Sequence, residues 1–461
     1  MPSGRVEESG YDVFVIGAGQ AGIPLAHALA KAGKRVALAE RKDVGGSCVN
    51  FGCTPTKAAI ASARVAHKAR SGALYGLRIP AVEVDFPAVL DRARSILMRS
   101  RTGLRRDLER TGNPRLIEGH ARLEGRDRQG FRVRVGNRRF RSRAVVLDTG
   151  TRTLVPDVPG LGQIDFLHAG NWLDRPELPE HVVFLGAGYI ALEMGQFYRR
   201  MGSRVTILER STSLLKREDE DVTSALQAVL ESEGIAFRLG ARVTRVARRG
   251  KRVTIEVAGG GHVRGTHLFV ATGRQPNTDD LGLSSVGLRR RRDGTIPVDR
   301  RLRTSVRGLW AAGDIRGGAM FTHAAWDDFR ILESQMLGDG SRTTARIVPY
   351  AVYTDPELGR VGMTEREAVA ARRRIRVGTF PMRSNGKAIE LGETGGFIKV
   401  VVDARTDRIL GAAVLSVEGA ELVHLYVDLM NAKAPWTALR DALHVHPTLA
   451  EAAQSAVLAL E

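Results

Sequence analysis

The sequence YDVFVIGAGQAG, at residues 11–22, sets the fold of the first part of the chain. Its first six residues are mostly apolar, as in a buried strand, and they run directly into a glycine turn. Apolar residues then recur at helical spacing to about Gly33, and a second strand is expected over residues 35–40. A strand, a glycine turn, a helix and a strand ending in the acidic Glu40 are typical of a dinucleotide-binding βαβ unit.

The same pattern returns later in the chain. The sequence HVVFLGAGYIA, at residues 181–191, predicts a strand and turn, then a helix to about Met201 and a strand over residues 204–209. Glu40 follows Gly17, and Glu209 follows Gly186, by the same 23 positions. Two such copies predict two dinucleotide sites, and the natural pairing is a tightly held flavin that receives hydride from a nicotinamide.

Three pairs of small residues are expected to shape the two turns. They are Gly17 and Gly186 at the tight turn, Gly19 and Gly188 where the backbone approaches a pyrophosphate, and Gly22 and Ala191 where helix meets strand. The unpaired N–H groups of each helix N-terminus would face the phosphates. The carboxylates of Glu40 and Glu209 would accept hydrogen bonds from an adenosine ribose.

Two cysteines, Cys48 and Cys53, lie between the two units. Their spacing does not fit a zinc knuckle and there is no second pair, so we expect no resident metal ion. In a reducing compartment a lone close pair is more often redox-active than structural. Residues i and i+5 of a regular helix are about 8.6 Å apart, beyond the roughly 7 Å that a disulfide allows. A bridge would therefore need a backbone distortion, which Gly52 can absorb, and would be easily reduced.

Composition excludes several classes of protein. At roughly 150 residues per domain, 461 residues suggest about three domains, and 43% hydrophobic with 26% charged residues excludes a disordered chain. The net charge of +19 is scattered, without a basic tail, so we expect no nucleic-acid partner but a field that attracts anionic substrates. No apolar run reaches the roughly 18 residues of a membrane span, and residues 1–8 lack a signal-peptide pattern. We expect a cytoplasmic protein without membrane association.

Several ordered motifs resemble those of the flavoprotein disulfide reductases, which include dihydrolipoamide dehydrogenase, glutathione reductase and mercuric reductase. Besides the two glycine turns they are GGSCVNFGC at residues 45–53, DTG at 148–150, ATGRQPN at 271–277, AGD at 312–314 and HPTLAE at 446–451. The resemblance implies a class I pyridine nucleotide disulfide oxidoreductase. Its α/β fold would have two Rossmann-like domains, for FAD and NAD(P)H, and a C-terminal α+β dimerisation domain.

The resemblance also implies domain boundaries and cofactor sites. Residues 1–150 would form the first part of the FAD domain with the redox disulfide, 151–271 the NAD(P)H domain, 272–346 the second part of the FAD domain, and 347–461 the interface domain. FAD would lie on the first glycine turn and Asp314, and the nicotinamide cofactor on the second turn, gated by Tyr189. The cofactor-binding residues implied are Gly17, Gly19, Gly22, Glu40, Gly46, Lys57, Thr149, Gly150, Gly186, Gly188, Tyr189, Glu193, Glu209, Gly273 and Asp314.

Catalytic roles follow from the same resemblance. Cys53 would face the flavin as a thiolate, and Cys48 would exchange electrons with the acceptor. Lys57 and Glu193 would pair beside the flavin. Imidazole is a suitable base at neutral pH, so His446, oriented by Glu451, would move the proton, acting from the other subunit of a homodimer.

Some stretches depart from dihydrolipoamide dehydrogenase toward mercuric-reductase-like and reactive-chlorine-resistance reductases. They are FGCTPTK at residues 51–57, KREDED at 216–221, FTH at 321–323, DPELGRVGMT at 355–364 and KAP at 433–435. We therefore favour electron transfer from NAD(P)H through FAD and the Cys48–Cys53 disulfide to a disulfide or metal-ion acceptor, in oxidative or metal stress. The alternatives are dihydrolipoamide dehydrogenase and a disulfide-independent NAD(P)H oxidase or transhydrogenase. Glu209 favours NADH because its carboxylate would repel a 2′-phosphate, while Arg210 leaves NADPH as an alternative.

Overall fold

Strand β1 (Val6–Ile16) lies at the centre of a seven-stranded sheet in the computed structural model, which describes residues 6–460. Residues 1–5, which carry part of the argument against a signal peptide, and residue 461 lie outside the described residues. The other strands of this sheet are β2 (Val36–Glu40), β3 (Arg115–Glu118), β4 (Ala121–Asp127), β5 (Gly130–Val135), β6 (Arg138–Leu147) and β17 (Leu309–Ala311). Because β17 pairs with β6, two stretches far apart in sequence build one sheet.

Alternation along β1 explains why both faces of this sheet are covered. Val13 and Val15 pack on the side of helices α1 (Gly22–Lys31) and α7 (Thr322–Leu337), whereas Phe14 and Ile16 pack on the opposite side. The parallel pairs β1–β2 and β1–β6 bring the first glycine turn to the carboxyl edge of the sheet. Dinucleotide-binding folds hold their ligand at this edge.

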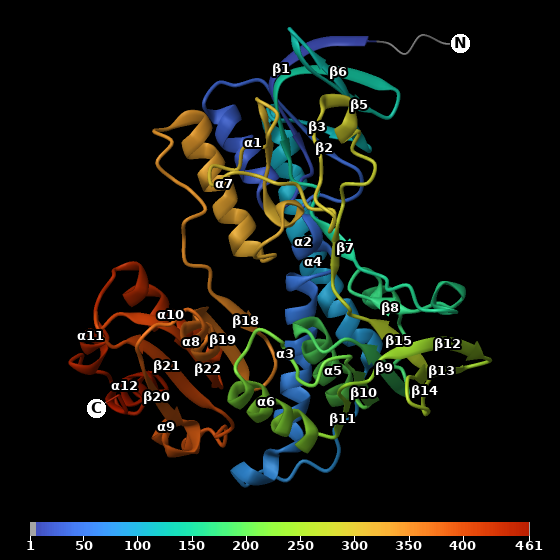
Figure 1. The fold of residues 1–461 in the computed structure, drawn as a ribbon. Helices are drawn as coiled ribbons and strands as arrows, with labels where there is room; N and C mark the ends of the chain where they lie inside the picture. The colour runs from blue at the N-terminus through green and yellow to red at the C-terminus, as the bar shows by residue number, and fades with distance from the viewer. Residues whose placement is uncertain (1–5, 461) are drawn as a thin grey trace.

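A long helical hairpin leads from the first sheet to the second unit (Figure 1). After the short α2 (Gly46–Asn50), the hairpin consists of α3 (Cys53–Arg70) and α4 (Phe86–Thr111). The Asp85 side chain accepts a hydrogen bond from the N–H of Ala88 and so caps α4. Helix α3 packs on both α4 and α5, so its first turn, which carries Cys53, is fixed between the two dinucleotide-binding units.

The second unit repeats the βαβ pattern. Its parallel sheet has the order β11-β10-β9-β15-β8. The strands are β8 (Leu167–His168), β9 (His181–Leu185), β10 (Arg204–Leu208), β11 (Ile235–Arg238) and β15 (His267–Val270), with helices α5 (Tyr189–Met201) and α6 (Glu220–Ser232) and the antiparallel β12 (Val243–Arg249), β13 (Arg252–Val257) and β14 (His262–Gly265). The chain passes between the two units twice, in strands β7 (Thr151–Thr153) and β16 (Arg274–Pro276), and these two strands pair antiparallel.

The C-terminal unit, orange to red in Figure 1, is an antiparallel sheet of order β18-β19-β22-β21-β20 covered by helices. Its elements are β18 (Tyr350–Val352), β19 (Glu357–Gly362), β20 (Ile375–Pro381), β21 (Phe397–Asp403), β22 (Ile409–Ser416), α8 (Glu365–Ala370), α9 (Gly386–Glu390), α10 (Gly419–Asn431), α11 (Thr437–Arg440) and α12 (Ala450–Leu458). The predicted α/β fold with two Rossmann-like units and a C-terminal unit is confirmed. Within residues 6–460, no helix is both long and apolar enough to cross a membrane.

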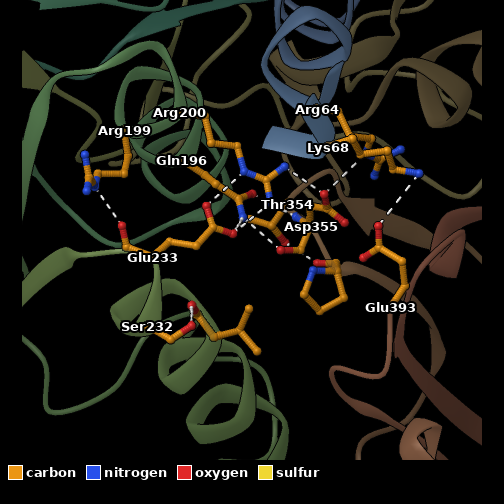
Figure 2. A network of polar contacts seen from close by, with 12 residues as sticks. Arg64, Lys68, Gln196, Arg199, Arg200, Ser232, Glu233, Thr354, Asp355 and Glu393 are labelled. Carbon is orange, nitrogen blue, oxygen red and sulfur yellow. Dashed lines mark hydrogen bonds and ion pairs between the residues drawn. The ribbon is translucent and has the colours of Figure 1, made fainter. Parts of the chain in front are cut away.

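A buried ionic network joins the three units (Figure 2). Arg200 on α5 pairs with Asp355 and Glu233, each at 2.7 Å, and Arg200 and Asp355 are only 6% and 5% exposed. Gln196, one turn earlier on α5, donates to the Asp355 carbonyl and accepts from its N–H, both at 2.8 Å. Arg64 on α3 reaches the same Asp355 carboxylate at 3.7 Å. The network fixes α3, α5 and the segment before β19 relative to one another.

We expect Arg200→Met to lower the free energy of unfolding by about 3–5 kcal/mol, because it leaves the buried Asp355 and Glu233 carboxylates without their main cation. The matched control is Arg204→Met, which breaks an exposed pair with Glu180 and should cost under about 1 kcal/mol. Urea-induced unfolding followed by circular dichroism measures both. Equal losses in the two variants would contradict the role of the network.

Candidate active site

A cavity of about 1030 Å³ opens between the first glycine turn, the start of α3 and the N-terminal ends of α5 and α7. Its volume is at the upper end of the range for ligand pockets. The predicted site residues that line it are Gly17, Gly19, Glu40, Gly46, Cys48, Cys53, Lys57, Thr149, Gly150, Tyr189, Glu193 and Asp314. Residues from four distant parts of the sequence therefore meet around one space.

The remaining predicted site residues lie elsewhere. Gly22 is behind the turn, where an added Cβ would be 2.1 Å from the carbonyl oxygen of Gly17. Gly186, Gly188 and Glu209 are at the edge of the second sheet, and Gly273 is at the crossing between units. His446 and Glu451 are in the C-terminal unit and do not line this cavity of the single chain.

The two glycine turns have the same local geometry. Gly17 and Gly186 both have positive φ, +108° and +98°, which favours glycine over any other residue. At the first turn Glu40 Oε2 accepts from the N–H of Ala18 at 3.0 Å, and at the second Glu209 Oε2 accepts from that of Ala187 at 2.9 Å. Each carboxylate thus braces its own turn and keeps acceptor capacity for a ribose hydroxyl.

The two cysteines lie on either side of a break between helices. Cys48 is in α2, Cys53 is the first residue of α3, and both thiols are free, which corresponds to the reduced dithiol. Gly52 makes the break: its N–H donates to the Ser47 carbonyl at 2.7 Å, and a Cβ there would be 2.8 Å from that oxygen. The sequence argument that Gly52 absorbs a backbone distortion is consistent with this geometry.

The surroundings give the two sulfurs opposite properties. A hydrogen bond from the Cys48 thiol lowers the pKa of Cys53 to about 6 against the effect of burial, and the Thr322 hydroxyl and the Lys57 charge lower it further. The hydrogen bond to Cys53, burial and the Cys53 charge all raise the pKa of Cys48 above its usual range. At neutral pH Cys53 is therefore the thiolate, and Cys48 is a thiol that donates to it.

Thr322 is a site residue that the sequence alone did not identify as one. It is the first residue of α7, and its hydroxyl lies 3.2 Å from Cys53 Sγ. The preceding Phe321 stacks on His323 and on Tyr350, at centroid distances of 5.6 and 5.3 Å. A threonine at the start of an amphipathic stretch that follows a glycine pair does predict a helix start at Thr322. No local pattern predicts that this threonine contacts Cys53, 269 residues away in the sequence.

The predicted pair of Lys57 and Glu193 is present, at 2.7 Å, with Glu193 4% exposed. The second carboxylate oxygen of Glu193 accepts from the N–H of Tyr353 at 2.9 Å, and the Lys57 ammonium lies 4.5 Å from the centre of the Tyr353 ring. Burial lowers the pKa of Lys57, but the Glu193 carboxylate together with the Cys53 and Tyr353 charges more than offsets this, so Lys57 stays charged. Tyr353 is a second site residue that the sequence did not reveal.

His446 and Glu451 form a hydrogen-bonded pair, with Nδ1 and Oε1 3.0 Å apart. The N–H of Thr448 donates to the other Glu451 oxygen at 2.7 Å, and this bond together with that from His446 lowers the pKa of Glu451. The His446 side chain is 79% exposed, next to the exposed Val445. The imidazole is oriented but stands away from the thiols of its own chain.

We expect Thr322→Val to raise the pKa of Cys53 by roughly one to two, because a hydrogen bond to a charged group is worth about 1.5–3 kcal/mol and one pKa unit is about 1.36 kcal/mol. In the reduced protein the Cys53 thiolate is present above about pH 6 and is lost as the pH falls through that value. In the variant the loss should begin at higher pH. Ultraviolet thiolate absorbance titrated with acid measures this, Thr322→Ser should restore the wild-type curve, and an unshifted curve in Thr322→Val would contradict it.

Comparison with known proteins identifies the family. The description "Pyridine nucleotide-disulphide oxidoreductase" matches residues 11–328, and the dimerisation domain of the same family matches residues 348–457. The chain belongs to the pyridine nucleotide-disulphide oxidoreductases, a family of FAD-dependent enzymes that use a pyridine nucleotide. The expected class of flavoprotein disulfide reductase is confirmed.

Three relatives illustrate the range within the family. "Probable pyridine nucleotide-disulfide oxidoreductase RclA" of Escherichia coli (strain K12) is 34% identical over 446 residues, 96% of this chain and 97% of that protein. A dihydrolipoyl dehydrogenase of Cupriavidus necator is 33% identical over 98% of both chains, and a mercuric reductase of Lysinibacillus sphaericus is 30% identical over 99% of this chain and 84% of that protein. The solved structure described as the HOCl-induced flavoprotein disulfide reductase RclA from Escherichia coli has a TM-score of 0.89 at 32% identity, covering 98% of this chain and all of that one.

The cavity residues fit the FAD that the family uses. A Cβ on Gly17 would be 2.2 Å from the Asp148 carbonyl oxygen, and one on Gly46 would be 3.0 Å from the Gly19 Cα, so bare backbone faces the cavity along this wall. The N-terminal end of α1, which begins at Gly22, carries the partial positive charge that favours a pyrophosphate. Lys57, Cys48 and Cys53 line the same cavity as these glycines.

Proposed function

We propose that this protein passes electrons from NAD(P)H, with FAD, to the Cys48–Cys53 disulfide and from the resulting dithiol to a small disulfide or metal-ion acceptor. The observation that carries the proposal is the difference between the two thiols: Cys53 is held as a thiolate by the hydrogen bond from Cys48 and further by Thr322 and Lys57, while Cys48 remains a thiol. When bound, the chemistry that FAD supplies is acceptance of hydride from a nicotinamide and delivery of an electron pair to a disulfide. The reaction suits a reducing, cytoplasmic compartment.

The chain's own residues account for the thiol chemistry. Cys48 must lose its proton before it can attack an acceptor, because the thiolate is the nucleophile. The base is His446, whose tautomer Glu451 fixes by accepting from Nδ1. His446 does not line the cavity of its own chain, so we propose that it acts in a homodimer, on the thiols of the other subunit. The dimerisation domain over residues 348–457 supports this arrangement.

The acceptor is proposed from the chain's own cysteine content and its relatives. The sequence has two cysteines in all, so within this chain electrons have no thiol relay beyond Cys48 and pass from it directly to the acceptor. The RclA structures are described as HOCl-induced and, in two cases, as Cu(II) complexes. We therefore favour a role in oxidative or metal stress, with Cu(II), Hg(II) or a small disulfide as acceptor. A dihydrolipoamide dehydrogenase is the second candidate, supported by 33% identity over nearly the whole chain.

The decisive experiment is an anaerobic titration of the holoenzyme with NADH, with and without the Cys48→Ser change. The wild type should consume two electron pairs, one for the flavin and one for the disulfide, and should develop long-wavelength absorbance from a thiolate against the flavin. Cys48→Ser should consume one pair and lose acceptor reduction to below about 1% of wild type, because no disulfide forms.

Two results would contradict the proposal. Full acceptor turnover by Cys48→Ser would favour the disulfide-independent oxidase or transhydrogenase, and bleaching of the wild-type flavin by a single electron pair would exclude the disulfide from the path. A panel of lipoamide, glutathione disulfide, Cu(II) and Hg(II) then ranks acceptors by kcat/KM. A clear preference for lipoamide would select the second candidate.

For the nicotinamide we propose NADH, and we expect Glu209→Gln to reduce the preference for NADH over NADPH about tenfold in kcat/KM. The reason is that the Glu209 carboxylate would repel a 2′-phosphate, while Lys216, 4.0 Å away, would then be free to attract one. Steady-state kinetics with both cofactors measure the ratio, and Glu180→Gln, at an exposed site near the same sheet, is the control. A wild type that prefers NADPH, or an unchanged ratio in the variant, would contradict the proposal.

A further inference from the structure

Asp148 is a buried carboxyl group in contact with the first glycine turn. It directly follows β6 and is 6% exposed. Its N–H donates to the Ile16 carbonyl at 2.8 Å, and its Oδ2 accepts from the N–H of Gly22 at 2.8 Å. Gly22 is the first residue of α1, so Asp148 binds one of the unpaired donors at that helix end from inside the protein.

The two oxygens of Asp148 fill the space between two loops. A Cβ on Gly19 would be 2.7 Å from Oδ2, and a Cβ on Gly313 would be 2.6 Å from Oδ1. Gly313 precedes the predicted FAD residue Asp314, which accepts from the Thr151 hydroxyl at 2.8 Å. The carboxyl group therefore separates and supports both loops on which FAD is proposed to lie, and a smaller side chain would leave a gap there.

The charges that face Asp148 are unfavourable to a carboxylate. Within residues 6–460, no lysine, arginine or histidine forms an ion pair with Asp148. The nearby Asp328, in contrast, pairs with Arg316 and Arg346, both at 2.6 Å. Asp314 on the adjoining turn has Arg274 at 3.6 Å. Burial raises the pKa of Asp148 well above its usual range, and the negative charges of Asp314 and Asp328 raise it further, against the lowering effect of the Gly22 N–H. Burial and these charges therefore favour the neutral acid over the carboxylate.

The charge state matters because of what Asp148 touches. The end of α1 carries partial positive charge that favours a pyrophosphate. An ionised carboxylate bound to Gly22 would neutralise that charge, whereas a neutral acid accepts the same hydrogen bond and leaves the positive charge for the phosphates.

We propose that Asp148 is a positioning residue for FAD, whose carboxyl group holds the first glycine turn and the 312–314 turn in their binding positions. It does so as a neutral acid. The inference rests on the proposed FAD site and deepens it.

The test compares FAD retention by holoenzyme of wild type, Asp148→Asn and Asp148→Ala, measured as free FAD fluorescence after ultrafiltration over a range of protein concentrations. Asn keeps the size and the acceptor oxygen but cannot ionise, so Asp148→Asn should hold FAD at least as tightly as wild type. Asp148→Ala leaves the gap and should raise the dissociation constant at least about tenfold. Wild-type tightness in Asp148→Ala, or equal weakening in both variants, would overturn the proposal.

A second measurement reads the protonation state without relying on affinity. The infrared difference spectrum of wild type minus Asp148→Asn at neutral pH should contain the carbonyl stretch of a protonated carboxylic acid, and carboxylate bands in its place would overturn the proposal even if Asp148→Ala does not fold. Failure of the wild type itself to bind FAD would instead refute the proposed function. The exposed Asp157→Asn serves as the control for nonspecific effects of removing an acid.

Discussion

The ion pair of Lys57 and Glu193 joins three parts of the chain at the point where the thiols lie. Lys57 is on α3, Glu193 is on α5, and the second oxygen of Glu193 holds the backbone of Tyr353 before the C-terminal sheet. Burying such a pair has a desolvation cost that its mutual attraction only partly offsets. Its value is therefore positional: it holds a cation in the cavity wall beside Cys53, where the thiolate needs one.

The same face of α5 extends this connection away from the site. Glu193, Gln196 and Arg200 are spaced three and four residues apart, so their side chains lie on one face of the helix. Glu193 accepts a hydrogen bond from the N–H of Tyr353, and Gln196 accepts one from the N–H of Asp355. Arg200 donates to the Asp355 carboxylate. A shift of the C-terminal unit along α5 would break all of these contacts together, so the position of the Lys57 charge depends on the packing of a distant unit.

Sequence reasoning succeeded where structure is local and failed where it is not. The βαβ units follow from glycine turns and apolar periodicity within about 30 residues, and Gly52 between the cysteines is a local signal as well. Thr322 and Tyr353 reach the site only through the packing of separate units, so no spacing along the chain reveals them. For Asp148 the motif was visible, but its burial and its lack of a cation partner are properties of the folded sheet.

The two thiols have different environments before any substrate is present, and this difference is the basis of the order proposed for them in the reaction. The Cys48 thiol donates a hydrogen bond to Cys53, so stabilising the Cys53 sulfur as an anion makes Cys48 a weaker nucleophile. The proposed mechanism therefore needs a base that takes the proton of Cys48. His446 and Glu451, exposed on the C-terminal unit, form an imidazole–carboxylate pair with Nδ1 and Oε1 3.0 Å apart. In the proposed homodimer, the outward-facing His446 of one subunit would meet the two unequal thiols of the other, so a symmetric dimer would form this site twice.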